Sequence, residues 1–264
     1  MKRNIFTIPF GLLLFILFCL SSCFETDQSN NATFGCFGTL YGSFTSGYSI
    51  VSDEGILLRP TNESIAKAVP DLTKPNQIRR VYFVFNVVGD NQPSQLIPGE
   101  TYDINIVASN QNYGSSASDL IDTYNNTAAS DTLMANPQPL MSIKESPQSW
   151  VANGYINLYT YFMYSYTSSF SMDLAYDSSC DIDTENNVIT VTLYYNTPAT
   201  VTDHTAYTYF HYRLPDSLQA KLKVDKPVTF KIRGVLDTTY ELKDIATIQC
   251  AYEDVKERIY YYPF

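Results

Sequence analysis

Residues that could carry acid–base or metal chemistry are few in this sequence. Only two histidines are present, His204 and His211. Neither has a cysteine or histidine partner at the spacing that metal sites use. His211 alternates with Tyr207, Tyr209 and Arg213 along one predicted strand face. This pattern favours a solvated or sheet-surface histidine over a metal ligand or a catalytic base.

Motifs for nucleophilic and nucleotide chemistry are also missing. The chain contains no G-x-S-x-G elbow, P-loop, G-x-G-x-x-G or H-E-x-x-H sequence. A pair of catalytic carboxylates stays open as an alternative, because 27 acidic residues are present. We therefore predict no catalytic residue, no metal and no cofactor, and rank an unrecognised hydrolase as the third functional hypothesis.

An acidic stretch, DSSCDIDTENN at 177–187, is the one segment rich in oxygen ligands. It places Asp177, Asp181, Asp183 and Glu185 close together. Such loops can hold Ca²⁺, but the turn glycine and the bidentate glutamate of an EF-hand are missing. We favour a solvated hairpin loop between two strands.

Tyrosine is the outstanding feature, with 22 in 264 residues. In the segment YINLYTYFMYSY, strand alternation separates a face with Ile156, Leu158 and Phe162 from a tyrosine-rich face. The tyrosine-rich face is too polar for a core, and exposed aromatic rings can stack on sugars or dock a protein. The predicted binding face consists of Tyr155, Tyr159, Tyr161, Tyr207 and Tyr209. We favour the simpler interpretation, that tyrosine is a good strand former that tolerates partial burial, and we keep the binding face as the alternative.

The beginning of the chain has the order of a secretory signal. Two basic residues precede an apolar stretch at 5–20, which is shorter than the roughly 20 residues of a spanning helix. Leu-Ser-Ser at 20–22 followed by Cys23 resembles the lipobox of bacterial lipoproteins. That resemblance implies cleavage before Cys23 and a diacylglycerol on its sulfur, so that acyl chains anchor the protein to a membrane. An ordinary signal peptide or an uncleaved anchor is the alternative.

Residues 1–22 are thus predicted as a lipoprotein signal peptide and 23–34 as a flexible tether. Glu25 and Asp27 resemble the surface-export signal of one group of lipoproteins, while a plain solvated tether is the other interpretation. We expect lipid anchoring at the outer membrane, with exposure at the cell surface if those acids act as an export signal.

The net charge argues against a nucleic-acid partner. Without residues 1–22, the remaining 242 residues hold 15 basic and 27 acidic side chains, a formal charge of −12. Such a surface repels phosphate backbones and gains nothing from counterion release. Beyond Cys23 the cysteines are Cys36, Cys180 and Cys250, which permit one disulfide but no disulfide framework.

The elements that must position these residues are β-strands. Period-two alternation covers 101–108, 189–195 and 228–233, and turn residues separate the runs. The segment 78–88, IRRVYFVFNVV, is apolar on nearly both faces, as in a strand of a closed or covered sheet. Short helices are predicted only at 62–69 and 216–221.

A polar stretch between about 109 and 139 suggests a domain boundary, because loops this long are uncommon inside one domain. We therefore predict an all-β protein with an OB-like barrel at 35–122, a linker at 123–137 and a β-sandwich at 138–264. The glycines Gly38 and Gly42 in the first strand suit a small, strongly coiled barrel.

This combination resembles the NigD-like lipoproteins of Gram-negative gut and oral anaerobes. The stretches that carry the resemblance are 20–23, 38–40 with the hairpin 48–60, 154–158 and 228–235. The resemblance implies a cell-envelope location, an OB-like domain followed by a β-sandwich, and a link to bacteriocin immunity, but it transfers no catalytic motif. The polar insert near 109–137 departs from the family pattern.

Three functions remain as hypotheses. The first is a non-catalytic envelope lipoprotein whose β domains bind a protein or a glycan. The second is a bacteriocin-immunity or protective lipoprotein, and the third is the hydrolase. The first is favoured because binding needs only shaped β surfaces, which this sequence supplies.

Overall fold

The computed structural model describes residues 32–43, 47–68, 79–89, 93–110, 117–133, 137–199, 202–237 and 239–258. Cys23 and the predicted signal peptide lie outside these residues. Within them, no helix has both the length and the apolar character that crossing a membrane requires.

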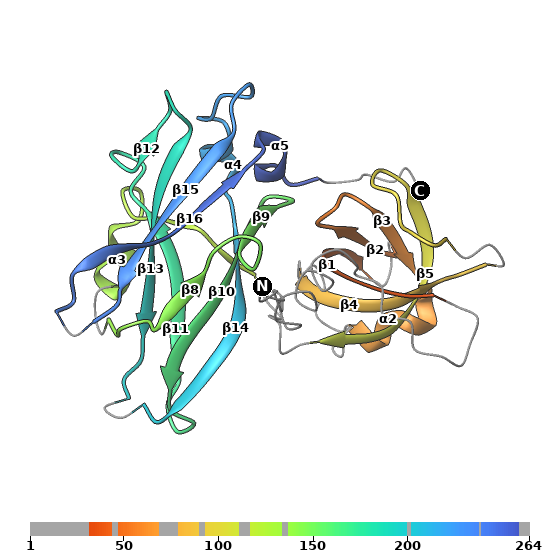
Figure 1. Ribbon diagram of the computed structural model, residues 1–264, viewed down its shortest axis with the longest axis horizontal. Coiled ribbons are helices and arrows are strands. Elements are labelled where there is room, and N and C mark those ends of the chain that lie inside the picture. The colour runs from red at the N-terminus through yellow and green to blue at the C-terminus, as the bar shows by residue number, and fades with distance from the viewer. Residues whose placement is uncertain are drawn as a thin grey trace, which may run out of the picture.

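The N-terminal part is a closed five-stranded barrel with the strand order β1-β2-β3-β5-β4, which confirms the OB-like prediction (Figure 1). Helix α2 (Asn62–Ala68) lies between its third and fourth strands, where a short helix was predicted. Alternate side chains of the strands fill the interior, and Phe83, Phe85, Ile104 and Ile106 are fully buried. The barrel strands are β1 (Thr33–Ser43), β2 (Gly47–Ser52), β3 (Leu57–Pro60), β4 (Arg79–Val87) and β5 (Thr101–Asn110).

The C-terminal part is a two-sheet sandwich, as predicted. The first sheet has the order β6-β14-β10-β8, with β9 also paired to β10. Its strands are β6 (Ala117–Asp119), β8 (Ser142–Lys144), β9 (Trp150–Ala152), β10 (Tyr155–Tyr164) and β14 (His204–Arg213).

The second sheet has the order β16-β15-β13-β11-β7, with β12 also paired to β13. Its strands are β7 (Ile121–Asp122), β11 (Ser171–Tyr176), β12 (Ile182–Asp183), β13 (Val188–Asn196), β15 (Val228–Val235) and β16 (Leu242–Cys250). The helices α3 (Thr127–Leu133), α4 (Asp216–Gln219) and α5 (Tyr252–Val255) complete this part. Ile156, Leu158 and Phe162 face Leu193 and Phe230 in the core between the sheets.

The predicted boundary at residue 122 needs correction. The barrel sheet ends at Asn110, and strands β6 and β7 pair in parallel with β14 and β11 of the sandwich. Leu120 belongs to the sandwich core, and Leu133 of α3, inside the predicted linker 123–137, is buried as well. Strands of three and two residues are too short to show alternation, which explains the error.

Candidate functional site

The tyrosine-rich face lies on the outside of the first sandwich sheet, on the side of the barrel (Figure 1). The antiparallel register of β10 and β14 places Tyr159 opposite Tyr209 and Tyr161 opposite Tyr207. Directly opposed residues share one side of a sheet, so the four rings stand on a common surface. We call Tyr159, Tyr161, Tyr207 and Tyr209 the aromatic face.

These four rings form one continuous stack. Tyr161 and Tyr207 have ring centroids 4.0 Å apart and planes within 4° of parallel. Tyr159 stacks on Tyr209 at 4.6 Å and on Tyr207 at 5.7 Å. Tyr207 is 49% exposed, and the other three rings are half-buried. The face therefore offers flat aromatic surface, held in place by mutual stacking.

Tyr155 does not belong to the exposed part of the predicted binding face. Its side chain is fully buried, and the Arg80 guanidinium lies 4.8 Å from its ring centroid. Burial raises the pKa of its phenol above the ordinary value. Alternation places it on the tyrosine-rich face correctly, but the barrel covers that end of the strand.

The barrel covers this end through a cluster of rings. Phe37 of β1 lies 5.1 Å from both Tyr209 and Trp150 and 5.9 Å from His211, measured between ring centroids. Trp150 and Tyr209 are themselves 5.5 Å apart. The sheet face that carries the aromatic stack is therefore also the face on which the barrel docks.

A buried arginine joins the two domains behind these rings. Arg80 of β4 is fully buried and is hydrogen-bonded to three acceptors. It donates to Asp53 Oδ2 at 2.6 Å, to Thr39 Oγ1 at 3.1 Å and, across the junction, to Asn157 Oδ1 at 3.0 Å. Trp150 Nε1 donates to the same Asp53 oxygen at 2.8 Å. This domain-junction cluster pairs a charge that would otherwise be costly to bury.

His211 lies inside the domain junction and is not solvated. It is only 2% exposed, and its Nδ1 is 2.7 Å from Asn157 Oδ1. Asn157 Nδ2 donates to the carbonyls of Trp150 and Tyr155, so Oδ1 must accept. His211 Nδ1 therefore carries a hydrogen and donates it. The predicted position on a sheet surface is correct, but the barrel covers that surface.

A second set of contacts holds the C-terminal segment against the barrel. Tyr41 of β1 donates to Glu257 Oε1 at 2.8 Å, and Arg213 of β14 donates to the other oxygen of Glu257 at 2.8 Å. Burial, followed by the nearby Glu257 carboxylate, raises the pKa of Tyr41. Asn153 accepts from the backbone N–H of Arg258 at 2.6 Å. The two domains thus contact each other at several points along the sheet.

The acidic segment 177–187 consists of turns on either side of strand β12, so the predicted hairpin loop contains a short strand that pairs with β13. Asp177 accepts from the backbone N–H of Ser179 at 2.8 Å, and Asp183 accepts from that of Glu185 at 3.0 Å. Side-chain hydrogen bonds, from Ser179 to Asp177 and from Asn186 to Asp183, lower the pKa of these two carboxyl groups, and the backbone N–H groups lower it further. In the part of the chain that the structure describes, no group of three or more acidic, histidine or cysteine side chains could hold a metal.

The cysteines Cys36, Cys180 and Cys250 are all free, so the disulfide that their number permits is not formed among them. Cys36 is buried in the barrel, whereas Cys180 is exposed in the acidic loop. Burial raises the pKa of Cys36, and it raises that of Cys250 to about 12.

Sequence reasoning missed the residues that join the domains. Arg80 stands inside the apolar run 78–88, and a charge in such a run demands a buried partner. That signal could have identified Arg80, but nothing in the sequence names Asp53 or Asn157 as its acceptors. Trp150, the one tryptophan of the chain, was likewise not singled out.

Comparisons with known proteins give the same architecture. No family model matches the chain, and no curated protein matches it. A toxin-related protein from Parabacteroides distasonis is 15% identical, with a TM-score of 0.56 over 84% of this chain and 95% of that one. A NigD-like immunity protein from Bacteroides caccae is 14% identical, with a TM-score of 0.51 over 84% and 93%.

An uncharacterised protein from Parabacteroides merdae, 14% identical, also matches, with a TM-score of 0.51 over 83% of this chain and 99% of that one. None of these three structures is described as an enzyme. At such identities the likeness concerns the fold alone. The architecture expected from the resemblance to NigD-like proteins, an OB-like barrel followed by a β-sandwich, is thus confirmed, and a NigD-like immunity protein shares it.

Proposed function

We propose that this protein is a non-catalytic interaction module that docks a partner protein on its aromatic face. One observation carries the proposal. The sheet face that already binds the barrel, through Tyr209 and its contact with Phe37, continues beyond the barrel as the stack of Tyr159, Tyr207 and Tyr161. A surface that docks one folded domain is suited to docking another.

The energetics of this surface support the proposal. Tyrosine and tryptophan dominate the residues that contribute most to protein interfaces, because they bury large areas at a low entropic cost. The stacked rings are already ordered, so a partner would immobilise few further side chains. A glycan on the same face is the alternative ligand from the sequence analysis.

We place the protein at the outer membrane through lipidation of Cys23, on the sequence features before that residue. Two or more acyl chains give stable anchoring, with about 0.8 kcal/mol for each buried CH₂ group. The predicted tether would then hold the β domains close to the membrane, with the aromatic face open to another envelope or extracellular protein.

Bacteriocin immunity is the second candidate function. It is favoured by the shared fold with a protein described as a NigD-like immunity protein. In that case the docked partner would be a toxin. Deleting the gene should then raise the sensitivity of the cells to a bacteriocin of the same community, and Tyr207→Ala should raise it as well.

Site-specific photo-crosslinking in intact cells tests the docking proposal. A photoreactive residue in place of Tyr207 should give a protein adduct, whereas the same residue in place of Tyr124 should give none. Tyr124 is also well exposed, at 62%, but lies away from the face. Equal adducts at both positions, or none at Tyr207, would contradict the proposal.

Binding of the identified partner then checks the individual rings. Tyr161→Ala or Tyr207→Ala should weaken binding about 5- to 100-fold, since burying a ring contributes roughly 1–3 kcal/mol. The melting temperature should change little for Tyr207→Ala, because removing an exposed ring leaves no core cavity.

A further inference from the structure

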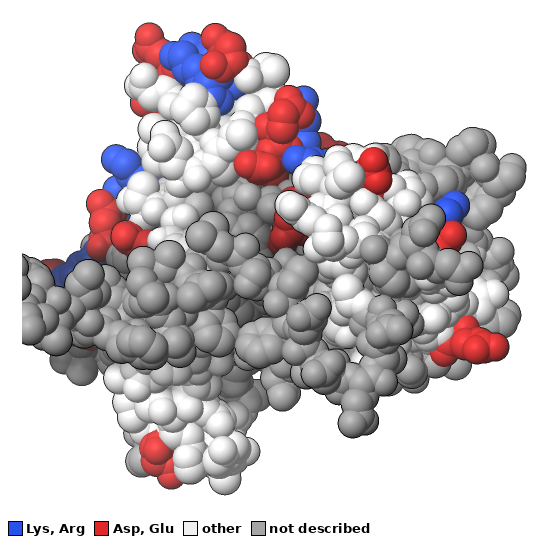
Figure 2. Space-filling model, turned by 45° about the vertical axis from the view of Figure 1, so that its right-hand side comes forward, with Lys and Arg blue, Asp and Glu red and all other residues white. Residues whose placement is uncertain are grey.

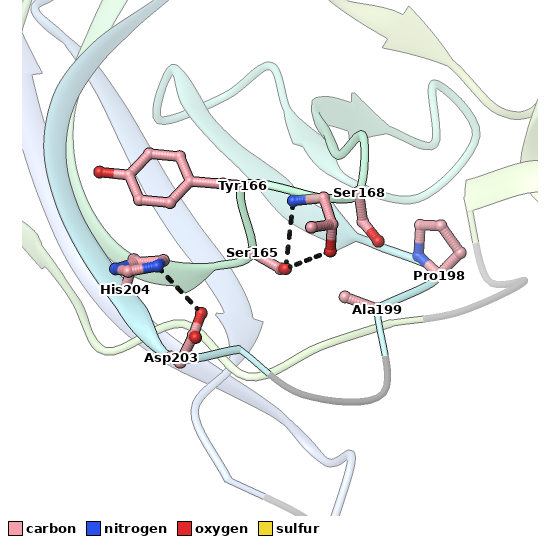
Figure 3. Close-up of a pocket in the computed structure, with 8 residues that line it drawn as sticks. Ser165, Tyr166, Ser168, Pro198, Ala199, Asp203 and His204 are labelled. Atoms are coloured by element: carbon pink, nitrogen blue, oxygen red, sulfur yellow. Dashed lines mark hydrogen bonds and ion pairs between the residues drawn. The ribbon is translucent and has the colours of Figure 1, made fainter.

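The turn after β10 lies at the end of the sandwich opposite helices α4 and α5 (Figure 1). A separate cavity is formed at this turn (Figure 3). Its volume is about 530 Å³, which is within the range of about 300–1,000 Å³ for small-molecule sites. The turn after β10, the segment after β13 and the start of β14 form its walls. They contribute Ser165, Tyr166, Thr167, Ser168, Pro198, Ala199, Asp203 and His204.

An exposed ring is held in a fixed orientation at this cavity. Tyr166 is 74% exposed, yet its ring centroid lies 4.1 Å from that of His204. The ring of Tyr164 packs edge-on against the ring of Tyr166, with ring centroids 5.1 Å apart. Figure 3 shows Tyr166 and His204 on one side of the cavity, with the carboxylate of Asp203 below the imidazole. These contacts orient the Tyr166 ring and leave one of its faces exposed to solvent.

Polar groups stand beside this ring. Asp203 Oδ1 lies 3.3 Å from His204 Nε2, and the Asp203 side chain is 62% exposed. The hydroxyl groups of Ser165 and Thr167 are hydrogen-bonded to each other at 2.9 Å. The cavity therefore combines a flat aromatic surface with a carboxylate acceptor and hydroxyl groups that both donate and accept.

The walls of the cavity are tied together. Thr197 Oγ1, in the segment after β13, donates to the carbonyl of Ser169, in the turn after β10, at 3.1 Å. Phe170 anchors that turn by packing on Phe162 of the core, with ring centroids 5.1 Å apart. The backbone N–H of Thr167 also donates to Ser165 Oγ at 3.3 Å. A ligand would therefore meet a preformed site, which lowers the entropic cost of binding.

The charge of the lining selects the ligand class. None of the eight described residues that line the cavity is a lysine or an arginine, and the imidazole of His204 already faces the Asp203 carboxylate, so a phosphate or another anion would lack an unpaired counter-charge. In Figure 2, basic and acidic side chains mix at the upper end of the sandwich, whereas the described surface at its lower end shows acidic atoms on an otherwise uncharged surface. The cavity lies at that lower end.

We propose that this cavity binds a neutral sugar residue, presented as a free sugar or at the end of a glycan. The C–H face of a pyranose ring fits against the electron-rich face of Tyr166. Two neighbouring sugar hydroxyls can donate to the Asp203 carboxylate, while the hydroxyls of Ser165 and Thr167 can reach further oxygens. This site is distinct from the aromatic face and would give the protein a second, carbohydrate-binding surface.

Saturation-transfer NMR on the full chain tests the proposal directly. The probes are six neutral sugars: glucose, galactose, mannose, xylose, N-acetylglucosamine and maltose. At least one of them should show transfer to its ring C–H protons. Tyr166→Ala should weaken its binding about tenfold or more, and Asp203→Asn should do so to a similar degree. Tyr166→Phe keeps the ring and should keep the binding.

Two control variants distinguish this site from the rest of the protein. Tyr124→Ala removes an exposed ring elsewhere, and Tyr207→Ala removes a ring of the aromatic face; neither should change sugar binding. The proposal is overturned if none of the six sugars binds, if Tyr166→Ala binds as the wild type does, or if Tyr207→Ala abolishes the signal. A failure here leaves protein docking on the aromatic face untouched, because that is measured by crosslinking at Tyr207.

Discussion

Replacing Arg80 with methionine tests how much the buried ion pair at the domain junction contributes to the free energy of unfolding. Methionine has a similar length but lacks the charge and all hydrogen-bond donors. Arg80→Met would leave the Asp53 carboxylate, whose side chain is only 8% exposed, without its cation. It would also remove the direct side-chain bond from the barrel to Asn157.

The expected cost follows from the burial of this pair. Removing one partner of a buried ion pair typically costs about 3–5 kcal/mol, because the other charge remains buried without compensation. The loss of the bond to Thr39 adds to this, whereas Asn157 keeps His211 as a donor. We therefore expect Arg80→Met to lower the free energy of unfolding by about 3–5 kcal/mol.

Trp150 provides the assay. It is the only tryptophan of the chain, and its Nε1 donates to Asp53 at the junction. Its fluorescence during denaturant unfolding therefore reports on the junction itself, while circular dichroism reports on both domains. In Arg80→Met the fluorescence transition should move to a lower denaturant concentration.

Arg59 is the matched control on the same barrel. It pairs with Asp103 at 2.8 Å, but the two side chains are 48% and 55% exposed, and such pairs contribute only about 0–1 kcal/mol. Arg59→Met should therefore change little. The double variant Arg80→Met with Asp53→Asn should cost less than the sum of the single variants, because it leaves no buried charge unpaired. An Arg80→Met cost equal to that of Arg59→Met, or full additivity in the double variant, would refute the reasoning.

Three further outcomes are expected. Cys23→Ser should release the protein from the membrane fraction, and a variant that still sediments with membranes would contradict lipidation. A thiol reagent should modify the exposed Cys180 first, whereas the partly buried Cys250 should react more slowly and the buried Cys36 only on unfolding; mass spectrometry of the labelled peptides checks this. Labelling of Cys180 should speed up as the pH rises and the thiolate forms, because partial desolvation of the sulfur and the nearby carboxylates of Asp181 and Asp177 raise its pKa. Tyr155→Ala should lower the stability by about 3–5 kcal/mol, whereas Tyr155→Phe should be nearly neutral in a thermal melt, since its buried hydroxyl has no hydrogen-bond partner in the described part of the chain.

Alternation along long strands made most of the fold predictable. Ile156, Leu158 and Phe162 are in the sandwich core, and Ile104 and Ile106 are in the barrel core, on the faces that a period of two predicts. Each of these strands is nine or more residues long, so the pattern repeats enough to be read. The polar stretch between the domains could not be read in this way, because β6 and β7 have only three and two residues.

Which tyrosines of the predicted binding face are exposed could not be predicted from the sequence of one strand, because the barrel buries part of that face. Alternation correctly placed Tyr155 and Tyr159 on the same face of β10, but one is fully buried and the other is half-buried. The difference arises because the barrel packs over one end of the strand, through Phe37 and Arg80. Contacts between domains join residues more than 70 positions apart, and no local pattern records them.

The buried junction also accounts for the geometry of the exposed face. Tyr209 touches Phe37 of the barrel on one side and stacks on Tyr159 on the other, so it links the fixed interior to the open rings. Tyr207 stacks on the less exposed Tyr159, and Tyr161 stacks on Tyr207, so these two rings extend the stack outward. Weakening the junction at Arg80 should therefore loosen the inner end of the aromatic face before it affects the strands themselves. Tyrosine thus has two positions in one sheet: Tyr209 contacts the barrel at the domain junction, and Tyr207 and Tyr161 form the outer part of the stack for which we propose a docking role.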